Sequence, residues 1–440
     1  MVPGGKGKIS ILLYLLPKLL LVILWFHYCA EVSAEPTSEP TGQPTLVLRD
    51  WFQVGADIDG EATGDQSGTS VSLSSDGNRV AIGARHNSEG GSNAGHTRIY
   101  EYGSSSWTQL GGDINGAEVY DLSGWAVSLS ADGSRVAIGD PFRNVGGLTD
   151  RGRVRLFDFN NVSVSWEQIG SEILGEATDD WSGYALSLSA DGSHVAIGAH
   201  HNDAGGTDAG HVRVYKYDSG WVQVGSDIDG DQSDGNSGIV VSISSDGSRV
   251  AVGIHDTGAG QVRVYEYDSS TWLQLGAHIE GEAASDLSGD AVSLSADGSR
   301  VAIGARGNDN SGGVDAGHVR VYAYNSTAWV QLGGDIEGEA AGDYSGFSVS
   351  LSADGSRLAI GGTYNDGGGV SNSGHVRVYE FDLLSASWVQ VGADVDGEEI
   401  NGYSGYSTSL SSDGSIVAIG SYTVNSAAGH VRVWQLAYLP

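Results

Sequence analysis

The sequence contains a single cysteine in 440 residues, Cys29, and it lies near the N-terminus. A disulfide scaffold, a cysteine-based zinc site and a cysteine nucleophile are therefore excluded for the body of the chain. Basic residues are also scarce, since 22 Lys and Arg stand against 55 Asp and Glu, and the formal net charge is -33. We expect no nucleic-acid partner, because phosphate backbones require clustered Lys and Arg.

Catalytic motifs are missing as well. The chain has no G-x-S-x-G nucleophile elbow, no H-E-x-x-H motif and no phosphate-binding loop. No segment after Ala34 keeps a helical period. With 40% hydrophobic residues the chain still has enough apolar surface for a core, so global disorder is excluded. These absences predict an all-β protein that is not an enzyme and uses no cofactor.

Residues 1–34 have the pattern of a secretory signal peptide. A basic start at Lys6 and Lys8 precedes an apolar stretch over 19–26, and Val32-Ser33-Ala34 offers small residues for cleavage. The alternative is an uncleaved anchor over 9–30, which Pro17-Lys18 would interrupt. We therefore expect a secreted chain that does not span a membrane unless the signal stays uncleaved.

Residues 35–47 form a Pro/Thr-rich linker with prolines at 36, 40 and 44. This composition predicts an extended spacer that joins no core. The remaining residues, 48–436, are predicted to fold as one unit.

Seven repeats fill that unit. Tryptophans recur at intervals of 51 to 59 residues, at Trp51, Trp107, Trp166, Trp221, Trp272, Trp329 and Trp388. Asp-Gly pairs recur at the same intervals, beginning at Asp76, Asp132, Asp191, Asp246, Asp297, Asp354 and Asp413. A period of this length indicates a solenoid or a propeller.

The sequence pattern of each repeat predicts four short strands. In the fifth, residues 291–295 alternate apolar with small polar residues, Asp297-Gly298 supplies a tight turn, and 301–304, 318–322 and 329–332 follow as strands. The chain begins with a fourth-strand motif at Trp51 and ends with a third-strand motif at 430–434. We therefore predict a seven-bladed β-propeller of four-stranded antiparallel blades, closed when the N-terminal strand completes the last blade.

The repeat pattern resembles the FG-GAP family, whose members include the propellers of integrin α-subunits. Asp343-Tyr344-Ser345-Gly346-Phe347-Ser348-Val349-Ser350-Leu351-Ser352 carries the resemblance, with Ala359-Ile360-Gly361-Gly362 following, and Ser-Gly stands where the family name has Phe-Gly. The resemblance implies a propeller in an extracellular setting. A WD-repeat propeller is the rival, but these units are too long for it.

The pattern departs from the family at the calcium loop. Some FG-GAP repeats hold calcium in D-x-D-x-D-G, whereas Ser72 and Ser74 precede Asp76-Gly77 here, and every other unit does the same. One carboxylate cannot supply the six to eight oxygens that Ca²⁺ takes. These Asp residues are therefore expected to serve the turns.

The position after each Ser-Gly pair is the best candidate for ligand binding. Trp125, Tyr184, Phe347 and Tyr406 occupy it in four units, and Thr69, Ile239 and Asp290 in the others. These residues begin the innermost strands, so they are expected to ring the channel mouth. The aromatics can stack on sugar or peptide there, or simply pack the channel.

Histidines precede the predicted third strand in five units, at His96, His211, His318, His375 and His430. Third strands lie far from the axis, so histidines of different blades cannot share one ion, and each is expected to hydrogen-bond a neighbouring blade or turn. The acidic inter-blade segments suggest either a weak cation site or a solvated rim. Because no full ligand set is visible, no metal site is predicted.

Two N-glycosylation sequons begin at Asn161 and Asn325, both just before a repeat tryptophan. Strand alternation puts them on the face that carries the Asp-Gly turns, which favours the opposite face for binding. The first hypothesis for function is a secreted, monomeric, non-catalytic propeller that recognises or adheres to an extracellular protein or glycan. The alternatives are a glycan-processing enzyme on a propeller scaffold and a structural acidic matrix protein.

Overall fold

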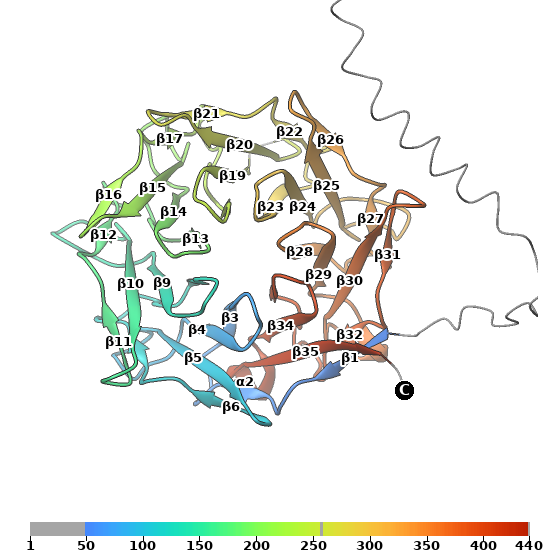
Figure 1. The fold of residues 1–440 in the computed structure, drawn as a ribbon, viewed down its shortest axis with the longest axis horizontal. Helices are drawn as coiled ribbons and strands as arrows, with labels where there is room; N and C mark the ends of the chain where they lie inside the picture. The colour runs from blue at the N-terminus through green and yellow to red at the C-terminus, as the bar shows by residue number, and fades with distance from the viewer. Residues whose placement is uncertain (1–48, 256–257, 439–440) are drawn as a thin grey trace, which may run out of the picture. The chain divides into compact units, whose positions relative to one another are not determined.

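A computed structural model describes residues 49–255 and 258–438. The predicted signal peptide and linker, residues 1–34 and 35–47, lie outside the described residues. The structure is a seven-bladed β-propeller, as predicted, with its antiparallel sheets arranged around a central axis (Figure 1).

The innermost strand of each blade alternates buried and half-buried residues, as its apolar–serine pattern predicts. In chain order, blades 1 to 7 begin with β3 (Ser67–Leu73), β8 (Ala126–Leu129), β13 (Ala185–Leu188), β18 (Val241–Ile243), β23 (Ser288–Leu294), β28 (Ser345–Leu351) and β33 (Ser407–Leu410).

The second strand is buried almost throughout, because both of its faces pack against neighbouring blades. These strands are β4 (Arg79–Ala84), β9 (Arg135–Asp140), β14 (His194–Ala199), β19 (Arg249–Ile254), β24 (Arg300–Ala305), β29 (Arg357–Gly362) and β34 (Ile416–Ser421).

The third strand has seven to nine residues, with its first half buried and its second half partly exposed. These strands are β5 (His96–Gly103), β10 (Arg153–Asn160), β15 (His211–Tyr217), β20 (Gln261–Tyr267), β25 (His318–Tyr324), β30 (His375–Asp382) and β35 (His430–Tyr438).

The fourth strand pairs only with the second half of the third. Six of these strands follow their third strand, namely β6 (Ser106–Gln109), β11 (Ser165–Gln168), β16 (Trp221–Gln223), β21 (Trp272–Gln274), β26 (Trp329–Gln331) and β31 (Ser387–Gln390). In blade 7 this strand comes from the other end of the chain, where β1 (Arg49–Gln53) pairs with β35 and Trp51 lies opposite Leu436.

Each blade also holds a fifth, two-residue strand that the sequence did not suggest. The seven are β2 (Ile58–Asp59), β7 (Ile114–Asn115), β12 (Ile173–Leu174), β17 (Ile228–Asp229), β22 (Ile279–Glu280), β27 (Ile336–Glu337) and β32 (Val395–Asp396). Each pairs with the first half of a third strand, which the short fourth strand leaves uncovered. An unpaired strand edge is a liability, so the inter-blade connection covers it. The described residues include two short helical turns, η1 (Gly367–Gly369) and α2 (Val424–Ala427).

The hydrophobic core lies between neighbouring blades. One cluster joins Ala81 and Ile99 of blade 1 to Val127, Val136 and Ile138 of blade 2, and the same arrangement recurs around the ring. The repeat tryptophans belong to these interfaces. Their indole N–H groups donate to a carbonyl of the preceding blade, at 2.7–3.2 Å in all seven cases.

Backbone hydrogen bonds link the seven blades into a closed ring around the axis. One N–H of each blade donates to a carbonyl of the next, at 2.7–3.0 Å, through Ser75, Ala131, Ala190, Ser245, Ala296, Ala353 and Ser412, and Ser412 donates back to Ser75. The serines inside the inner strands form a second ring. Ser72 Oγ, for example, accepts the N–H of Leu129 in the next blade at 2.9 Å.

The second-strand glycines allow this close approach. A Cβ at Gly304 would lie 2.0 Å from the carbonyl oxygen of Gly346 in the next blade, and the equivalent contact recurs in every blade. Only glycine fits such a backbone contact. This requirement accounts for part of the high glycine content.

The Asp-Gly carboxylates serve their turns, as expected. Asp132 accepts hydrogen bonds from Ser130 Oγ at 2.7 Å, Ser134 N at 2.9 Å and Ser134 Oγ at 2.8 Å. We call the face with these turns the turn face. The third-to-fourth-strand tips share it, because Ala323 near the end of β25 lies opposite Arg300 at the start of β24. Both sequons fall on such tips, after Asn160 and Tyr324.

The opposite face, here called the loop face, carries the second-to-third-strand loops and the inter-blade connections. No helix within 49–255 and 258–438 is long and apolar enough to cross a membrane.

We predict that Gly304→Ala strongly destabilises the propeller, by about 3 kcal/mol or more, because the new methyl group meets backbone rather than a side chain that can move. Gly334→Ala is the matched control, since nothing lies within 4 Å of its Cβ position. Its effect should stay within about 1 kcal/mol. Denaturant unfolding measures both, and equal stability of the two variants would contradict the close-contact account.

The Asp-Gly turns also predict a pH dependence. Partial burial alone would raise the pKa of Asp132, but hydrogen bonds from Ser130 and Ser134 outweigh it and hold the pKa below its ordinary value of 3.8. A carboxylate with a lowered folded pKa stabilises the fold above the unfolded pKa, and this stabilisation is lost as pH falls through the folded pKa. Asp132→Asn should therefore lower the melting temperature at pH 7, and the difference should narrow below about pH 4.

Thermal melts of both chains between pH 7 and 3 at constant ionic strength test this. Asp218→Asn is the control, because the Asp218 carboxylate accepts no hydrogen bond from any described residue. The prediction would be contradicted if the melting temperature of the Asp132→Asn variant differed from that of the native chain by the same amount at every pH.

Candidate functional site

The loop-face end of the channel forms a cavity of about 270 Å³. All seven residues that follow a Ser-Gly pair line it, including the predicted candidates Trp125, Tyr184, Phe347 and Tyr406. The structure thus brings the four aromatic candidates together at one mouth. They come from four different blades and lie up to 281 positions apart in the chain. Arg85, His255 and Arg306 complete the lining.

The aromatic side chains form two arcs. In the first, the rings of Trp125 and Tyr184 lie 5.0 Å apart, and Phe142 packs 5.4 Å from Trp125. In the second, Phe347 and Tyr406 lie 4.9 Å apart. These are favourable aromatic contacts, and they hold the rings in fixed positions.

Arg85 lies between the two arcs. Its guanidinium carbon is 4.5 Å from the Trp125 ring centroid and 5.8 Å from that of Tyr422. Its Nε donates to Gln66 Oε1 at 2.9 Å. No carboxylate among the described residues pairs with it, so its charge is available to a ligand.

Asp290 and Arg306 form an ion pair through Oδ2 and Nε on the other side of the mouth. His255 Nδ1 lies 3.8 Å from Asp290 Oδ1, and the Arg306 guanidinium lies 5.3 Å from the Phe347 ring centroid. The mouth therefore combines apolar ring faces with fixed hydrogen-bonding charges.

Tyr184 of the mouth keeps its proton at neutral pH, because burial raises its pKa. Beside the mouth, burial together with the neighbouring Tyr406 and Tyr364 raises the pKa of Tyr422 to about 12. Burial, reinforced by His201, lowers the pKa of His200 to about 3, so this imidazole is neutral.

Sequence reasoning missed Arg85, His255 and Arg306. All three directly follow a second strand, at one register of the repeat. The residue type at this position differs from repeat to repeat, as it does at the position after each Ser-Gly pair. This variation within an otherwise uniform repeat is the sequence signal that could have identified these three residues. The opposite channel end offers no such chemistry, because leucine, isoleucine, serine and alanine side chains line its cavity of about 240 Å³.

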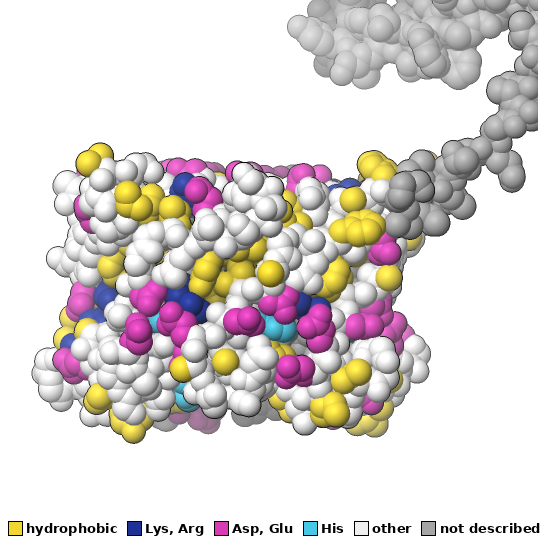
Figure 2. Space-filling model, turned by 90° about the horizontal axis from the view of Figure 1, so that it is seen from below, with side chains coloured by type: hydrophobic (Ala, Val, Ile, Leu, Met, Phe, Trp, Pro, Cys, Tyr) yellow, Lys and Arg dark blue, Asp and Glu magenta, His cyan; other side chains and the backbone are white. Residues whose placement is uncertain are grey.

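On the outer wall of the ring, Asp and Glu side chains gather in a band with Arg, Lys and His among them (Figure 2). The third-strand histidines lie beside carboxylates that belong to such clusters. Each of the five stands beside carboxylates of its own inter-blade connections. The prediction that each histidine forms a hydrogen bond with a neighbouring blade or turn is wrong for His96 and His211, whose ring nitrogens have no hydrogen-bond partner among the described residues. The reason is distance, since Glu61 Oε2 lies 3.9 Å from His96 Nδ1. Burial, with Arg98 adding to it, lowers the pKa of His96 to about 4.

No family model matches this chain, and no curated protein matches it. Among solved structures, the chain is similar to the hydrazine synthase of Kuenenia stuttgartiensis, with a TM-score of 0.54 and 14% sequence identity over 88% of this chain and 98% of that one. At this identity the similarity concerns the fold alone.

Proposed function

We propose that this protein is a secreted, non-catalytic recognition module that binds a glycan in the loop-face channel mouth. The observation that carries the proposal is the convergence of Trp125, Tyr184, Phe347 and Tyr406 on one cavity of about 270 Å³. This volume is near the lower end for small-molecule sites, roughly 300–1,000 Å³, and suits a single sugar unit at the end of a chain.

Aromatic faces suit this ligand. The C–H-bearing face of a sugar ring packs on aromatic rings, while its hydroxyl groups require hydrogen-bond partners at the edges. Protonated Tyr184, Arg306 and Asp290 supply donors and acceptors beside the rings. The packing of the two arcs fixes the aromatic rings before binding, which reduces the entropy cost.

Arg85 favours an acidic sugar. Its guanidinium carries a charge without a carboxylate partner among the described residues, and a planar guanidinium matches a carboxylate through two parallel hydrogen bonds. A uronic or sialic acid would therefore bind better than a neutral sugar.

A non-catalytic role also agrees with the carboxylates of the mouth. Glycoside hydrolysis generally requires two carboxyl groups that flank the bond. Asp290 is the only carboxylate among the described residues of the lining, and Arg306 pairs with it. Turnover of a polysaccharide by the purified protein would instead favour the glycan-processing alternative.

The predicted signal peptide, the two sequons and the resemblance to FG-GAP repeats support an extracellular location. The proposal makes the loop face the binding surface, because glycans at Asn161 and Asn325 would obstruct the turn face. A protein ligand would engage the same face through its surrounding loops.

A glycan array that presents uronic-acid, sialic-acid and neutral termini tests the proposal. We predict that Trp125→Ala and Tyr406→Ala each weaken binding about tenfold, the loss expected for one aromatic contact of about 1.4 kcal/mol. Arg85→Gln should reduce the preference for acidic over neutral termini. Phe52→Ala is the matched control, since Phe52 is an aromatic residue of β1, 44% exposed and outside the mouth lining. The proposal would be contradicted if the protein bound no glycan, or if the Phe52 variant lost as much glycan affinity as the mouth variants.

A second prediction concerns the face. Gly147→Asn places an asparagine two positions before Thr149, with Leu148 between them, and so creates an N-glycosylation sequon in a loop of the loop face. Gly147 has φ +83° and nothing within 4 Å of its Cβ position, and asparagine tolerates this conformation. In a host that adds N-glycans, this variant should lose glycan binding, whereas Asn161→Gln with Asn325→Gln should retain it. Loss on removing the native sequons, with normal folding, would move the binding surface to the turn face.

A further inference from the structure

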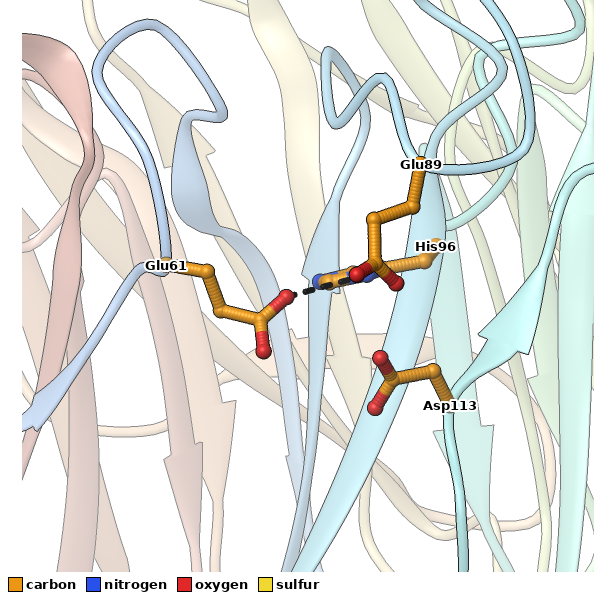
Figure 3. A group of neighbouring side chains, drawn as sticks. All are labelled: Glu61, Glu89, His96 and Asp113. Atoms are coloured by element: carbon orange, nitrogen blue, oxygen red, sulfur yellow. Dashed lines mark ion pairs between the residues drawn. The ribbon is translucent and has the colours of Figure 1, made fainter.

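Five blades repeat one cluster of side chains at the start of the third strand. Blade 1 shows it most fully, with His96 surrounded by Glu61, Glu89 and Asp113 (Figure 3). Within each cluster the potential ligand atoms lie within 4.8 Å of one another. The other four groups are Glu176, His211 and Asp227; Glu282, His318 and Asp335; Glu339, His375 and Asp394; and Asp57, Asp59 and His430.

The imidazoles at the centre of these clusters are buried. His96 and His211 are each 0% exposed, and neither ring nitrogen of either residue has a hydrogen-bond partner in the described chain. A buried polar group without a partner is costly. The nearest carboxylate oxygens lie at 3.9 Å from Nδ1 in both blades, which is too long for a hydrogen bond.

A glutamine orients the aspartate of each cluster. Its Nε2 donates to Oδ1 of the aspartate at 2.5–2.6 Å in all five blades, in the pairs Gln53–Asp57, Gln109–Asp113, Gln223–Asp227, Gln331–Asp335 and Gln390–Asp394. Oδ2 is left to face the imidazole, 3.6 Å from Nδ1 in His375 and in His430. A neighbour that holds a carboxylate in position is typical around metal ligands.

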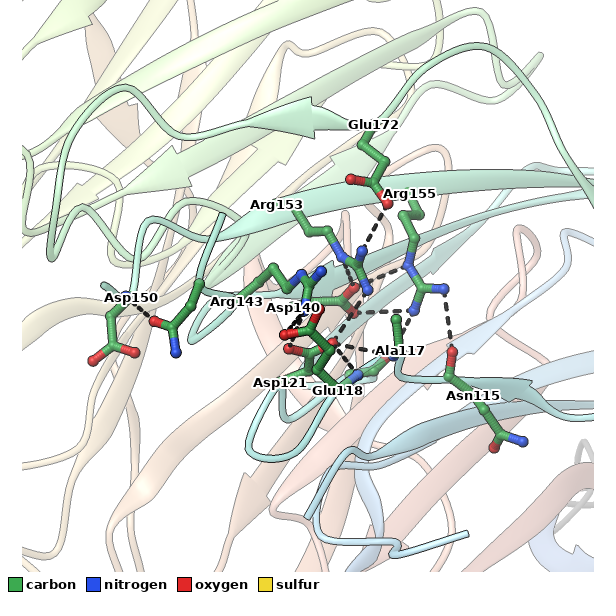
Figure 4. A network of polar contacts seen from close by, with 12 residues as sticks. Asn115, Ala117, Glu118, Asp121, Asp140, Arg143, Asp150, Arg153, Arg155 and Glu172 are labelled. Carbon is green, nitrogen blue, oxygen red and sulfur yellow. Dashed lines mark hydrogen bonds and ion pairs between the residues drawn. The ribbon is translucent and has the colours of Figure 1, made fainter. Parts of the chain in front are cut away.

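The two blades without this histidine also lack the aspartate. In blade 2, Arg153 replaces the histidine and Glu172 the aspartate, and they pair at 2.7 Å (Figure 4). In blade 4, Gln261 and His278 occupy the two positions, as the register of β20 with β22 shows. The histidine and the aspartate therefore occur together or not at all. In blade 2 the guanidinium brings a positive charge to this position.

We propose that these five clusters are divalent metal sites that take Zn²⁺ through one imidazole nitrogen and two carboxylate oxygens. Zinc bonds nitrogen and oxygen at about 2.0–2.2 Å, so tetrahedral ligand atoms lie roughly 3.3–3.5 Å apart. The nearest carboxylate oxygen lies 3.6–3.9 Å from Nδ1 in each cluster and needs only a few tenths of an ångström of contraction, while all the potential ligand atoms of a cluster lie within 4.8 Å of one another. An imidazole ligand favours zinc over Ca²⁺ or Mg²⁺, which take oxygen ligands.

Four of the five sites would join neighbouring blades, because one glutamate ligand of each comes from the connection that leaves the preceding blade, namely Glu61, Glu176, Glu282 and Glu339. Glu61 belongs to the connection that leaves β2 of blade 7, whereas His96 and Asp113 belong to blade 1 and the connection that leaves it. Arg98 already pairs with Glu61 Oε1 at 3.3 Å, which leaves Oε2 toward the imidazole. Zinc would thus stabilise the ring at four of its seven junctions, whereas Asp57, Asp59 and His430 all belong to blade 7 and its own connection.

Equilibrium dialysis of the purified chain against ZnCl₂ after chelator treatment, followed by elemental analysis, tests the proposal. Five saturable zinc ions per chain are expected, one for each cluster. His211→Gln should lower this number by one, and Asp227→Asn provides a second variant of the same site. Glutamine is a conservative choice, because Gln261 occupies the equivalent position in blade 4.

A gain-of-site variant makes the test sharper. Asp231→Glu, Gln261→His and His278→Asp together give blade 4 the full ligand set and should raise the number by one. Zinc should also raise the melting temperature saturably, whereas MgCl₂ at equal ionic strength should not. Absence of saturable zinc binding, or the same stoichiometry in the native and variant chains, would overturn the proposal.

Discussion

The close contact between successive blades is the constraint on which the rest of this structure depends. Each second-strand glycine lies against the backbone of the next blade, and one backbone hydrogen bond per blade closes a ring that returns from Ser412 to Ser75. A side chain at the glycine would push the blades apart, so the repeat keeps glycine there in all seven units. The Oγ of Ser72 and its equivalents then accepts from the next blade, and the repeat tryptophans close the outer part of each interface. The repeats are uniform in sequence because every blade makes these same contacts.

A uniform ring leaves few positions free to differ, and these lie outside the close backbone contacts between successive blades. The residue after each Ser-Gly pair lines the loop-face mouth, and so does the first residue after the second strand in blades 1, 4 and 5. There the seven blades contribute different chemistry, aromatic in blades 2, 3, 6 and 7 and charged at Asp290 and Arg306 in blade 5. The asymmetric mouth is thus the natural place for selective binding on a scaffold that is otherwise repetitive.

The outer wall follows a different rule, because its His–Asp pairs recur in five blades and vanish together in two. Recurrence agrees with a role in joining blades rather than in recognising one ligand. The short fifth strand makes the arrangement possible, because its pairing with the third strand fixes the connection that carries the aspartate. In blade 6, His375 lies opposite Asp396 of β32, and the cluster aspartate, Asp394, stands two residues before Asp396. Carboxylates that would otherwise be solvated are held beside a buried imidazole.

Much of the fold was determined by the sequence alone. Local patterns predicted the count of seven blades, the alternation of the inner strands and the Asp-Gly turns, because the same physical contacts recur in every repeat. The ring position of Trp125, Tyr184, Phe347 and Tyr406 also followed, because the first strand of a blade is the innermost. Tertiary structure alone decided which other residues join them: Arg85 and Trp125 lie 40 positions apart and meet only when two blades close on each other. It also decided the wall clusters, because Glu61, His96 and Asp113 come from three segments whose separation in the chain carries no sign of contact. Periodicity reveals what each blade shares, but contacts between blades arise only when the ring is closed.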